Sequence, residues 1–304
     1  MFKNLDTPPD QQAPMLWVDF SELRALVHPD KCFSKGDLIG IARRGLDIGR
    51  IFDADERWKL IADMVKIRQL SFGSAYPFKV SQDQDTIELH FDESGIQTTY
   101  LGLLIASTLR NVEITQRNHI ARAFEETSIV IFSNLMPDGV EVRATWAGGG
   151  AGAPYTGSKF EKFTRLANDL RCTANFSKED MDSQDSGDGG IDMIAWHPMA
   201  DLRAGTPIAF AQCGCSRDDW IYKQMEPHTA KHYRNLPVMH RWSNYYFLPL
   251  DFRRPDGDWA HKFDMADVIF VDRLRLLRLA EQYSKIDALP TMEYVAEALV
   301  QEYS

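Results

Sequence analysis

Two short apolar segments in the second half of the chain carry polar side chains that could bind a cation. The first, GDGGIDMIAW, spans 187–196, and the second, PIAFAQCG, spans 207–214. Side chains alternate along a strand, so Asp192 and Gln212 would each project from one face of a β-hairpin. A carboxylate among apolar residues is costly unless a charged partner meets it, and a divalent metal ion or a buried Arg or Lys would serve. The spacing therefore predicts a polar site on two neighbouring strands.

Glycines beside the first acid permit a sharp change of chain direction. Gly189 and Gly190 allow backbone conformations that other residues avoid, and they come just before the strand that carries Asp192. Such a bend would bring an acid to the end of the hairpin. Asp188, directly before the glycines, would either reach the same site or close the turn.

The elements around the hairpin must hold these side chains in place. Apolar spacing predicts an amphipathic helix over 158–170 before the hairpin and a helix over 216–225 after it. A strand over 245–252 and a strand–helix pair over 267–283 follow. The order helix, hairpin, helix, strand is typical of an α/β fold.

The first half of the chain is predicted to be mainly helical. Helical apolar spacing occurs over 19–27, 55–70, 100–111 and 117–132. Two short strands around a polar turn are expected within 76–93, and a further strand over 139–147.

The Gly-rich segment AGGGAGAPYTGS follows this half and predicts a flexible joint. We therefore expect an N-terminal domain over 1–147, a joint over 148–157 and a second domain over 158–304. A phosphate-binding loop is the alternative, although the glycines fit neither GxxxxGK[ST] nor GxGxxG.

With the elements placed, the motif resembles a known family. The string Asp188-Gly189-Gly190-Ile191-Asp192, with Gln212 on the next strand, is similar to the PD-(D/E)XK restriction-endonuclease-like superfamily, and within it to the Mrr-like branch. The Phe160-Glu161 pair on the preceding helix fits the same pattern. The resemblance covers 158–252. It implies a restriction-endonuclease-like core in an α/β fold, preceded by a mainly helical α+β N-terminal domain.

The resemblance also implies a Mg²⁺- or Mn²⁺-dependent endonuclease that hydrolyses phosphodiester bonds. Asp192, Gln212 and Glu161 would hold the metal ion through oxygen ligands. The ion would polarise the phosphate and lower the pKa of a water. Glu161 has a second interpretation, because Ser158 three residues earlier would make it part of a helix capping box.

The lysine that such sites usually carry two residues after the second ligand is missing, and Gly214 stands there. Lys223, on the predicted helix after the hairpin, would supply the cation beside the attacking water. A surface lysine with a solvated ammonium group is the alternative. Arg253 and Arg254, after the next strand, would contact phosphate or form surface ion pairs.

The composition bounds the partners and the compartment. The chain has 304 residues and a net charge of −10, which argues against a broad nucleic-acid-binding surface but allows a local basic groove. Its four cysteines are too few for a disulfide framework, so a reducing cytoplasm is expected. We find no apolar run of membrane-helix length and no secretory signal.

These observations predict a cytoplasmic nuclease whose partner is nucleic acid, with DNA favoured over RNA. By resemblance it would serve bacterial defence against phage or plasmids, as an oligomer or with a partner subunit of the same system, and not at a membrane. Two alternatives stay open. One is a catalytically inactive binding or scaffold subunit with a nuclease fold, and the other is a different hydrolase that uses Asp192 and Glu161 as an acid–base pair.

Overall fold

The computed structural model describes residues 1–9, 13–45, 53–145, 155–182 and 187–303. Contacts divide the chain into two compact units. Unit 1 comprises Met1–Phe124, Pro249–Ala260 and Asp272–Ser304, and unit 2 comprises Glu125–Leu248 and His261–Val271. Within the described ranges, no helix is both long enough and apolar enough to cross a membrane.

This division differs from the expected one, in which a joint over 148–157 separates two domains. Positions 148–154 of that segment lie outside the described residues. Strand β4 (Glu141–Ala144) precedes the segment and pairs with β5 (Met193–Trp196), which follows it. Residues on both sides of the segment therefore belong to one sheet, and two later stretches of the chain complete unit 1.

The protein has a mixed α/β fold. In the described part of the chain, the strands form an antiparallel sheet of three in the helical N-terminal region and a mixed sheet of five after it. The expectation of an α/β protein with a mainly helical first part is confirmed at this level.

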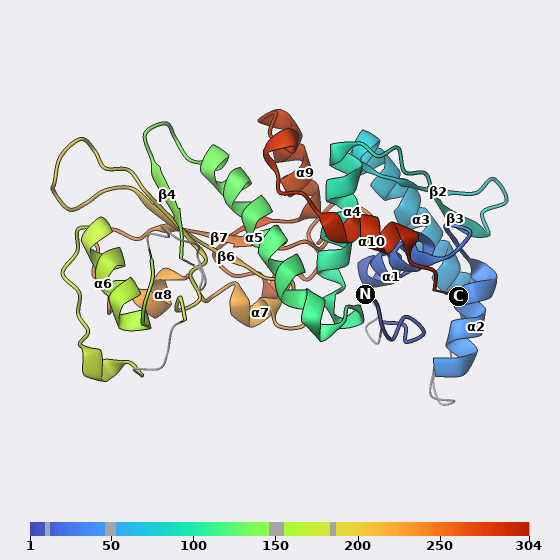
Figure 1. Ribbon diagram of the computed structural model, residues 1–304, viewed down its shortest axis with the longest axis horizontal. Helices are drawn as coiled ribbons and strands as arrows, with labels where there is room; N and C mark the ends of the chain where they lie inside the picture. Colours follow the sequence, from blue (N-terminus) through green and yellow to red (C-terminus); the bar gives the residue numbers. More distant parts are fainter. Residues whose placement is uncertain (10–12, 46–52, 146–154, 183–186, 304) are drawn as a thin grey trace. The chain divides into compact units, whose positions relative to one another are not determined.

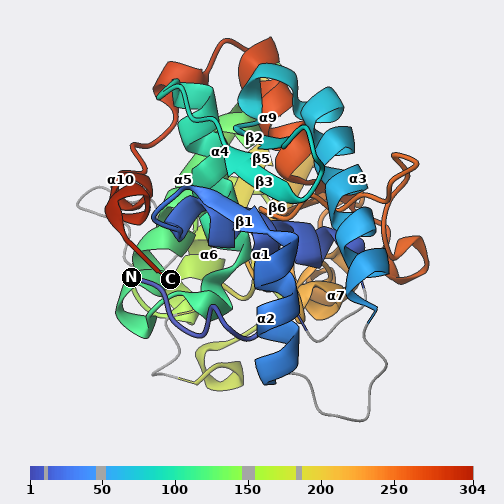
Figure 2. The ribbon, with the colours of Figure 1, turned by 90° about the vertical axis from the view of Figure 1, so that its right-hand side faces the viewer.

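Helices make up most of unit 1. They are α1 (Pro14–Val27), α2 (Lys35–Gly45), α3 (Ala54–Phe72), α4 (Gly95–Ser107), α9 (Arg273–Gln282), α10 (Glu293–Val300), the first part of α5 (Ile114–Leu135), and the 3₁₀ helices η1 (Gly73–Ala75), η2 (Leu109–Asn111) and η5 (Ile286–Ala288). The strands are β1 (Cys32–Ser34), β2 (Phe78–Val80) and β3 (Thr86–Leu89). Helix α1 contacts β1 and β3 as well as α3, an arrangement that Figure 2 shows.

Local sequence fixes the limits of these helices, as α3 illustrates. The side chain of Asp53 accepts hydrogen bonds from the backbone N–H groups of Asp55 and Glu56, both at 3.0 Å, and so caps the start of the helix. Gly73 ends the helix with a φ of 58°, a conformation that favours glycine.

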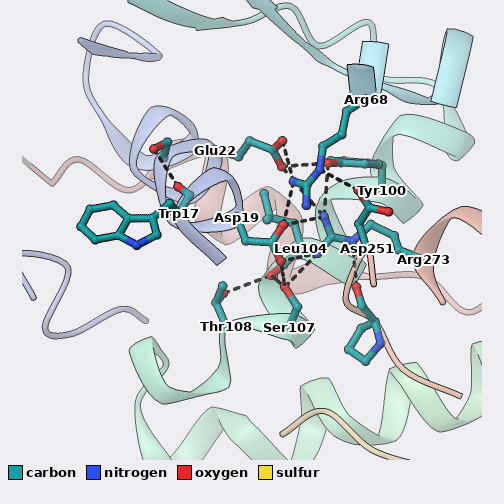
Figure 3. A network of polar contacts seen from close by, with 12 residues as sticks. Trp17, Asp19, Glu22, Arg68, Tyr100, Leu104, Ser107, Thr108, Asp251 and Arg273 are labelled. Carbon is teal, nitrogen blue, oxygen red and sulfur yellow. Dashed lines mark hydrogen bonds and ion pairs between the residues drawn. The ribbon is translucent and has the colours of Figure 1, made fainter. Parts of the chain in front are cut away.

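Buried charged residues occupy the core of unit 1 (Figure 3). Arg68 of α3 pairs with Asp19 and Glu22 of α1 at 2.7 and 2.8 Å, and with Asp251 at 2.9 Å. Arg273, the first residue of α9, pairs with Asp19 at 2.8 Å. Burial alone would raise the pKa of Asp19, but Arg273 and Arg68 hold it below its usual value. These ion pairs tie both later stretches of unit 1 to its N-terminal helices.

Unit 2 is built on the mixed sheet, and strands β4, β6 and β7 of this sheet are labelled in Figure 1. The strand order is β4-β5-β6-β7-β8, with β6 (Ile208–Cys213), β7 (Ser243–Phe247) and β8 (Ile269–Val271). Strands β4, β5 and β6 are antiparallel, whereas β7 and β8 run parallel to β6. The remaining elements are α6 (Lys159–Asp169), α7 (Trp220–Lys223), α8 (Thr229–His232), the rest of α5, η3 (Lys178–Asp180) and η4 (Lys262–Asp264).

The two faces of this sheet have different covers. On one face, Phe132 of α5 packs edge-on against Tyr245 and Phe247 of β7. Residues of the other face join α6 in one apolar cluster, which includes Phe163, Leu166, Ile194, Phe210 and Trp242. The alternation predicted for the hairpin is therefore present, because Ile194 and Phe210 share the face that is expected to carry Asp192 and Gln212.

Candidate functional site

Asp192, Gln212 and Tyr246 lie side by side across the sheet of unit 2. Strands β5 and β6 pair Met193 with Ala211, and the backbone N–H of Asp192 donates to the carbonyl of Ala211 at 2.9 Å. Continuing this register by one residue places Asp192 opposite Gln212. Gln212 pairs in turn with Tyr246 of β7. Because cross-strand neighbours share a face, the three side chains project from the same side of the sheet.

The turn that leads into β5 depends on its two glycines. Gly189 and Gly190 have φ angles of 72° and 81°, in the region that favours glycine. A Cβ on Gly189 would lie 2.5 Å from the ring of Phe163, and one on Gly190 would lie 2.5 Å from the Cβ of Glu226. Asp188 accepts a hydrogen bond from the backbone N–H of Gly190 at 2.8 Å, so it closes the turn.

A pocket of about 550 Å³ lies at this end of the hairpin, and all of its lining residues belong to unit 2. It brings together four of the residues predicted from the sequence: Asp188, Asp192, Gln212 and Lys223. Asp188 therefore closes the turn, as one of its two interpretations predicted, and it also lines the pocket.

Asp192 is buried in a setting that disfavours its charge. Its side chain is 5% exposed, and Oδ2 accepts a hydrogen bond from the backbone N–H of Cys213 at 2.6 Å. Burial raises the pKa of its carboxyl well above the usual range, and nearby Asp188 and Glu125 raise it further. The Cys213 N–H and Lys223 act in the opposite direction. A cation at this position would relieve both the desolvation and the repulsion.

Gln212 has a buried side-chain oxygen that could bind a ligand. Its Nε2 donates to the carbonyl of Cys213 at 3.4 Å, whereas Oε1 has no hydrogen-bond partner among the described residues. Leaving a buried polar atom unpaired costs about 1–3 kcal/mol. An amide oxygen of this kind is a suitable ligand for Mg²⁺ or Mn²⁺.

Lys223 approaches the same cluster from α7. It lines the pocket, it is partly buried, and its charge acts to lower the pKa of Asp192. Helix α7 is fixed nearby by Gln224, whose Nε2 donates to the carbonyl of Asp264 at 2.8 Å and whose Oε1 accepts from the N–H of Ala266 at 2.8 Å. Lys223 therefore lies near Asp192 and lines the same pocket as Asp188. This is the position expected of a lysine that replaces the one missing at Gly214.

Glu161 lies elsewhere. It is exposed and is not among the described residues that line the pocket. Its Oε2 accepts hydrogen bonds from the backbone N–H of Ser158 at 2.7 Å and from its Oγ at 3.1 Å, which completes a capping box at the start of α6. These hydrogen bonds lower the pKa of the Glu161 carboxyl. The structure thus supports the capping interpretation and does not bring Glu161 and Asp192 together.

Arg253 and Arg254 belong to unit 1 and form ion pairs there. Arg253 binds Asp272 through two hydrogen bonds of 2.8 and 3.2 Å. Arg254 pairs with Asp256 at 2.8 Å and with Asp258 at 3.6 Å. Of the two expected roles, ion pairing is the one that the structure contains.

Two acids of the pocket were not predicted from the sequence. Glu125 of α5 and Glu226, just after α7, both line it and are partly buried. Glu125 follows the buried Phe124 and precedes the buried Thr127, so it stands at the edge of the apolar face of its helix. A helical projection of the predicted segment 117–132 would have singled it out as an acid beside the core.

Two lysines and a histidine complete the polar lining of the pocket. Lys231 donates from Nζ to the carbonyl of Gly189 at 3.0 Å, and Lys159 is the first residue of α6. His232 is 4% exposed, and its Nε2 lies 2.7 Å from the carbonyl oxygen of Glu226. Burial lowers the pKa of His232 to about 4, and the charges of Lys231 and Lys159 add to this effect. His232 is therefore neutral at physiological pH, and as the Nε2–H tautomer that this contact favours it can accept a hydrogen bond at Nδ1.

Position 214, where such sites usually carry the lysine, has no room for a side chain. Gly214 is buried, and a Cβ added to it would overlap the hydroxyl oxygen of Tyr246 and lie 2.9 Å from Cζ of the same ring. Any larger residue at 214 would have to displace Tyr246, which is fully buried.

The pocket could bind a divalent cation, but its buried ligands would not all be carboxylates. In the described ranges, no three Asp, Glu, His or Cys side chains are grouped tightly enough to hold a metal ion by themselves. The buried donors are one carboxylate, Asp192, and one unpaired amide oxygen, Gln212. Hard oxygen donors of this kind suit Mg²⁺ or Mn²⁺, which usually keep several waters.

Comparison of the chain with protein-family models, with curated protein sequences and with solved structures found no match.

Proposed function

We propose that unit 2 is a metal-dependent nuclease of restriction-endonuclease-like fold, and that the protein hydrolyses phosphodiester bonds of nucleic acid. The observation that carries the proposal is the buried pair Asp192 and Gln212, neighbours on β5 and β6, in a pocket that also contains Lys223. The sheet supports it as well. Helix α6 is followed by the antiparallel hairpin of β5 and β6, by the short helices α7 and α8, and by the parallel strand β7, which fits the order helix, hairpin, helix, strand that the resemblance implies.

In this proposal each pocket residue has a task. Asp192 and Gln212 would hold a Mg²⁺ or Mn²⁺ ion, with Glu125 and Asp188 contributing further negative charge. When bound, the ion supplies polarisation of the phosphate and a water of lowered pKa. Lys223 offsets the negative charge that develops on the phosphate as the bond breaks.

The substrate would approach a pocket of mixed charge on a protein whose net charge is −10. Lys159, Lys223 and Lys231 line the pocket together with four acids, Glu125, Asp188, Asp192 and Glu226. A bound divalent ion would offset these acids, and the lysines would then attract phosphate groups. The preference for DNA over RNA and a role in defence with a partner subunit rest on the resemblance and are part of the proposal. A recognition or regulatory task for the N-terminal region, residues 1–147, is also part of the proposal and does not follow from the resemblance.

The test compares cleavage of plasmid DNA and of RNA, with Mg²⁺ and with Mn²⁺, by the wild type and three variants. Asp192→Ala should abolish cleavage and Mn²⁺ binding by calorimetry while leaving the melting temperature intact. Lys223→Ala should lower the turnover rate about 10²- to 10³-fold and leave Mn²⁺ affinity unchanged. Glu179→Gln, which changes an exposed acid outside the pocket lining, is the matched control and should behave as the wild type. Equal Mn²⁺ affinity in wild type and Asp192→Ala would remove this site from consideration.

A second candidate is a binding or scaffold subunit that has the fold without the activity. One observation favours it: the position that usually carries the lysine is closed by Tyr246. In that case the wild type should bind Mn²⁺ or nucleic acid but leave DNA and RNA intact under all conditions, including with candidate partner subunits present.

A further inference from the structure

Gly214 and Tyr246 form a complementary pair. The hydroxyl of Tyr246 lies where a side chain at position 214 would begin. Gly214 is held there by its own backbone, because its N–H donates to the carbonyl of Phe247 at 3.0 Å. Gly214, which follows β6, therefore makes room for the tyrosine of β7, and a side chain at position 214 would displace Tyr246.

The hydroxyl of Tyr246 is buried, and its oxygen has no hydrogen-bond partner among the described residues. Tyr246 as a whole is 0% exposed. A phenol hydroxyl can donate a hydrogen bond to a ligand that reaches it.

A second unpaired group lies on the neighbouring strand. Gln212 is opposite Tyr246 in the parallel pairing of β6 and β7, and its Oε1 is also buried without a partner among the residues that the structure describes. One group is an acceptor and the other is a donor, and both project from the same face of the sheet. Buried unpaired groups are rare in folded proteins, so two neighbours of opposite character point to a shared ligand.

We propose that Gln212 and Tyr246 together bind one water molecule. Tyr246 would position this water in place of the lysine that such sites usually carry at the position of Gly214. A water can donate to the Gln212 oxygen and accept from the Tyr246 hydroxyl, which satisfies both. The catalytic part rests on the proposed nuclease function. There the Gln212 oxygen would use one lone pair for the ion and the other for this water. The water would be the one that attacks the phosphodiester, held by Tyr246 while Lys223 supplies the positive charge.

The first arm of the test measures stability without metal and does not depend on catalysis. Tyr246→Phe removes only the hydroxyl. If the hydroxyl binds a water, the melting temperature should fall by about 2 °C or more. Gln212→Met should have a similar effect, and the double variant should lose less than the sum of the two. An unchanged or raised melting temperature in Tyr246→Phe would show a hydroxyl without a ligand and would overturn the proposal.

The second arm measures catalysis. Tyr246→Phe should lower kcat about 10- to 100-fold, in the range of one positioned donor, with KM and Mn²⁺ affinity unchanged. Tyr245→Phe is the matched control, because Tyr245 lies on the same strand but packs against Phe132 on the other face, and it should keep wild-type kcat. A wild-type kcat in Tyr246→Phe overturns the positioning role. Absence of cleavage in the wild type overturns the nuclease function and leaves the first arm to decide on the water.

The third arm exchanges the pair. Gly214→Lys alone should unfold or lose several degrees of melting temperature, because its stem overlaps Tyr246. Combined with Tyr246→Ala, the lysine can enter the vacated space. The double variant should then regain both stability and at least tenfold in kcat over Tyr246→Ala alone. A double variant no more active than Tyr246→Ala would mean that the hydroxyl and the lysine do not serve the same task.

Discussion

Unit 1 and unit 2 each contain a buried aspartate, and the surroundings shift the pKa of the two carboxyl groups in opposite directions. Asp19 in unit 1 lies within hydrogen-bonding distance of two arginines and a serine, at 2.7–2.8 Å, and its pKa is lowered. Asp192 in unit 2 has one backbone N–H at 2.6 Å, and its pKa is raised. The residue type and the depth of burial are alike, at 3% and 5% exposed, so the partners make the difference.

The contrast separates a structural cluster from a candidate binding site. In unit 1 each buried charge meets an opposite charge inside the fold, so a ligand would gain little there. In unit 2 the acids outnumber the cations near Asp192, and the Gln212 oxygen beside them is unpaired within the described chain. Uncompensated groups of this kind persist where an external ligand completes them.

The largest change in stability is expected from removing one charge of the buried ion-pair network in unit 1. Arg68→Met leaves Asp19, Glu22 and Asp251 short of one cation, and removing one member of a buried ion-pair network costs about 3–5 kcal/mol. Urea unfolding should show this loss. Arg254→Met is the matched control, because its pair with Asp256 is exposed and should contribute less than about 1 kcal/mol. Equal stability of the two variants would mean that the unit 1 cluster is not structural.

A smaller effect is expected from pH through His232. Its pKa in the folded protein is about 4, against an ordinary value of 6.5, so the unfolded chain takes up the proton first as the pH falls. The stability that neutral His232 contributes is present above pH 6.5 and is lost between 6.5 and 4, by roughly 2 kcal/mol. Unfolding free energies measured across this range should decline more steeply in the wild type than in His232→Gln. His90→Gln, an exposed control, should retain the wild-type slope.

The smallest effect is a gain of stability. Asp192→Asn keeps an acceptor for the Cys213 N–H and removes the charge, so the metal-free protein should gain about 1 kcal/mol at neutral pH. Because the folded pKa of Asp192 is raised, this gain should disappear as the pH falls toward the ordinary aspartate value of 3.8. With saturating Mn²⁺ the order should reverse, since only the wild type is stabilised by the ion. A loss of stability without metal would contradict the contrast between the two units.

Much of the fold was predictable because it follows from local apolar spacing. The segments 55–70 and 100–111 became α3 and α4, and the hairpin strands became β5 and β6 within a few residues. Elements without a clear apolar period were missed, among them β1, α2 and α10. The division into units was not predictable either. It depends on which distant stretches pack together, and the ion pair between Arg68 and Asp251 leaves no local signal.

The sequence could place residues of the candidate site together where the motif and the alternation of side chains along a strand agreed, but not elsewhere. Asp192 and Gln212 were placed by motif and period, and Lys223 by its distance along the chain from the hairpin. Glu161 had two interpretations, and only the folded structure could show the capping hydrogen bonds. Tyr246 could not be found, because an aromatic residue in a strand usually belongs to the core, and the unpaired hydroxyl becomes evident only once Gly214 is seen beside it.

The ion pairs of unit 1 also have a consequence for the folding of the chain during its synthesis on the ribosome. Asp19 and Arg273 are 254 positions apart in the chain, and Arg68 and Asp251 are 183 apart. At ordinary rates of translation, roughly 10–50 s pass between the synthesis of Asp19 and that of Arg273. During that interval Asp19 can pair with Arg68 but not yet with Arg273, while every residue of unit 2 has been made by its end. The ion-pair network of unit 1 can therefore be completed only after the whole of unit 2 has been synthesised.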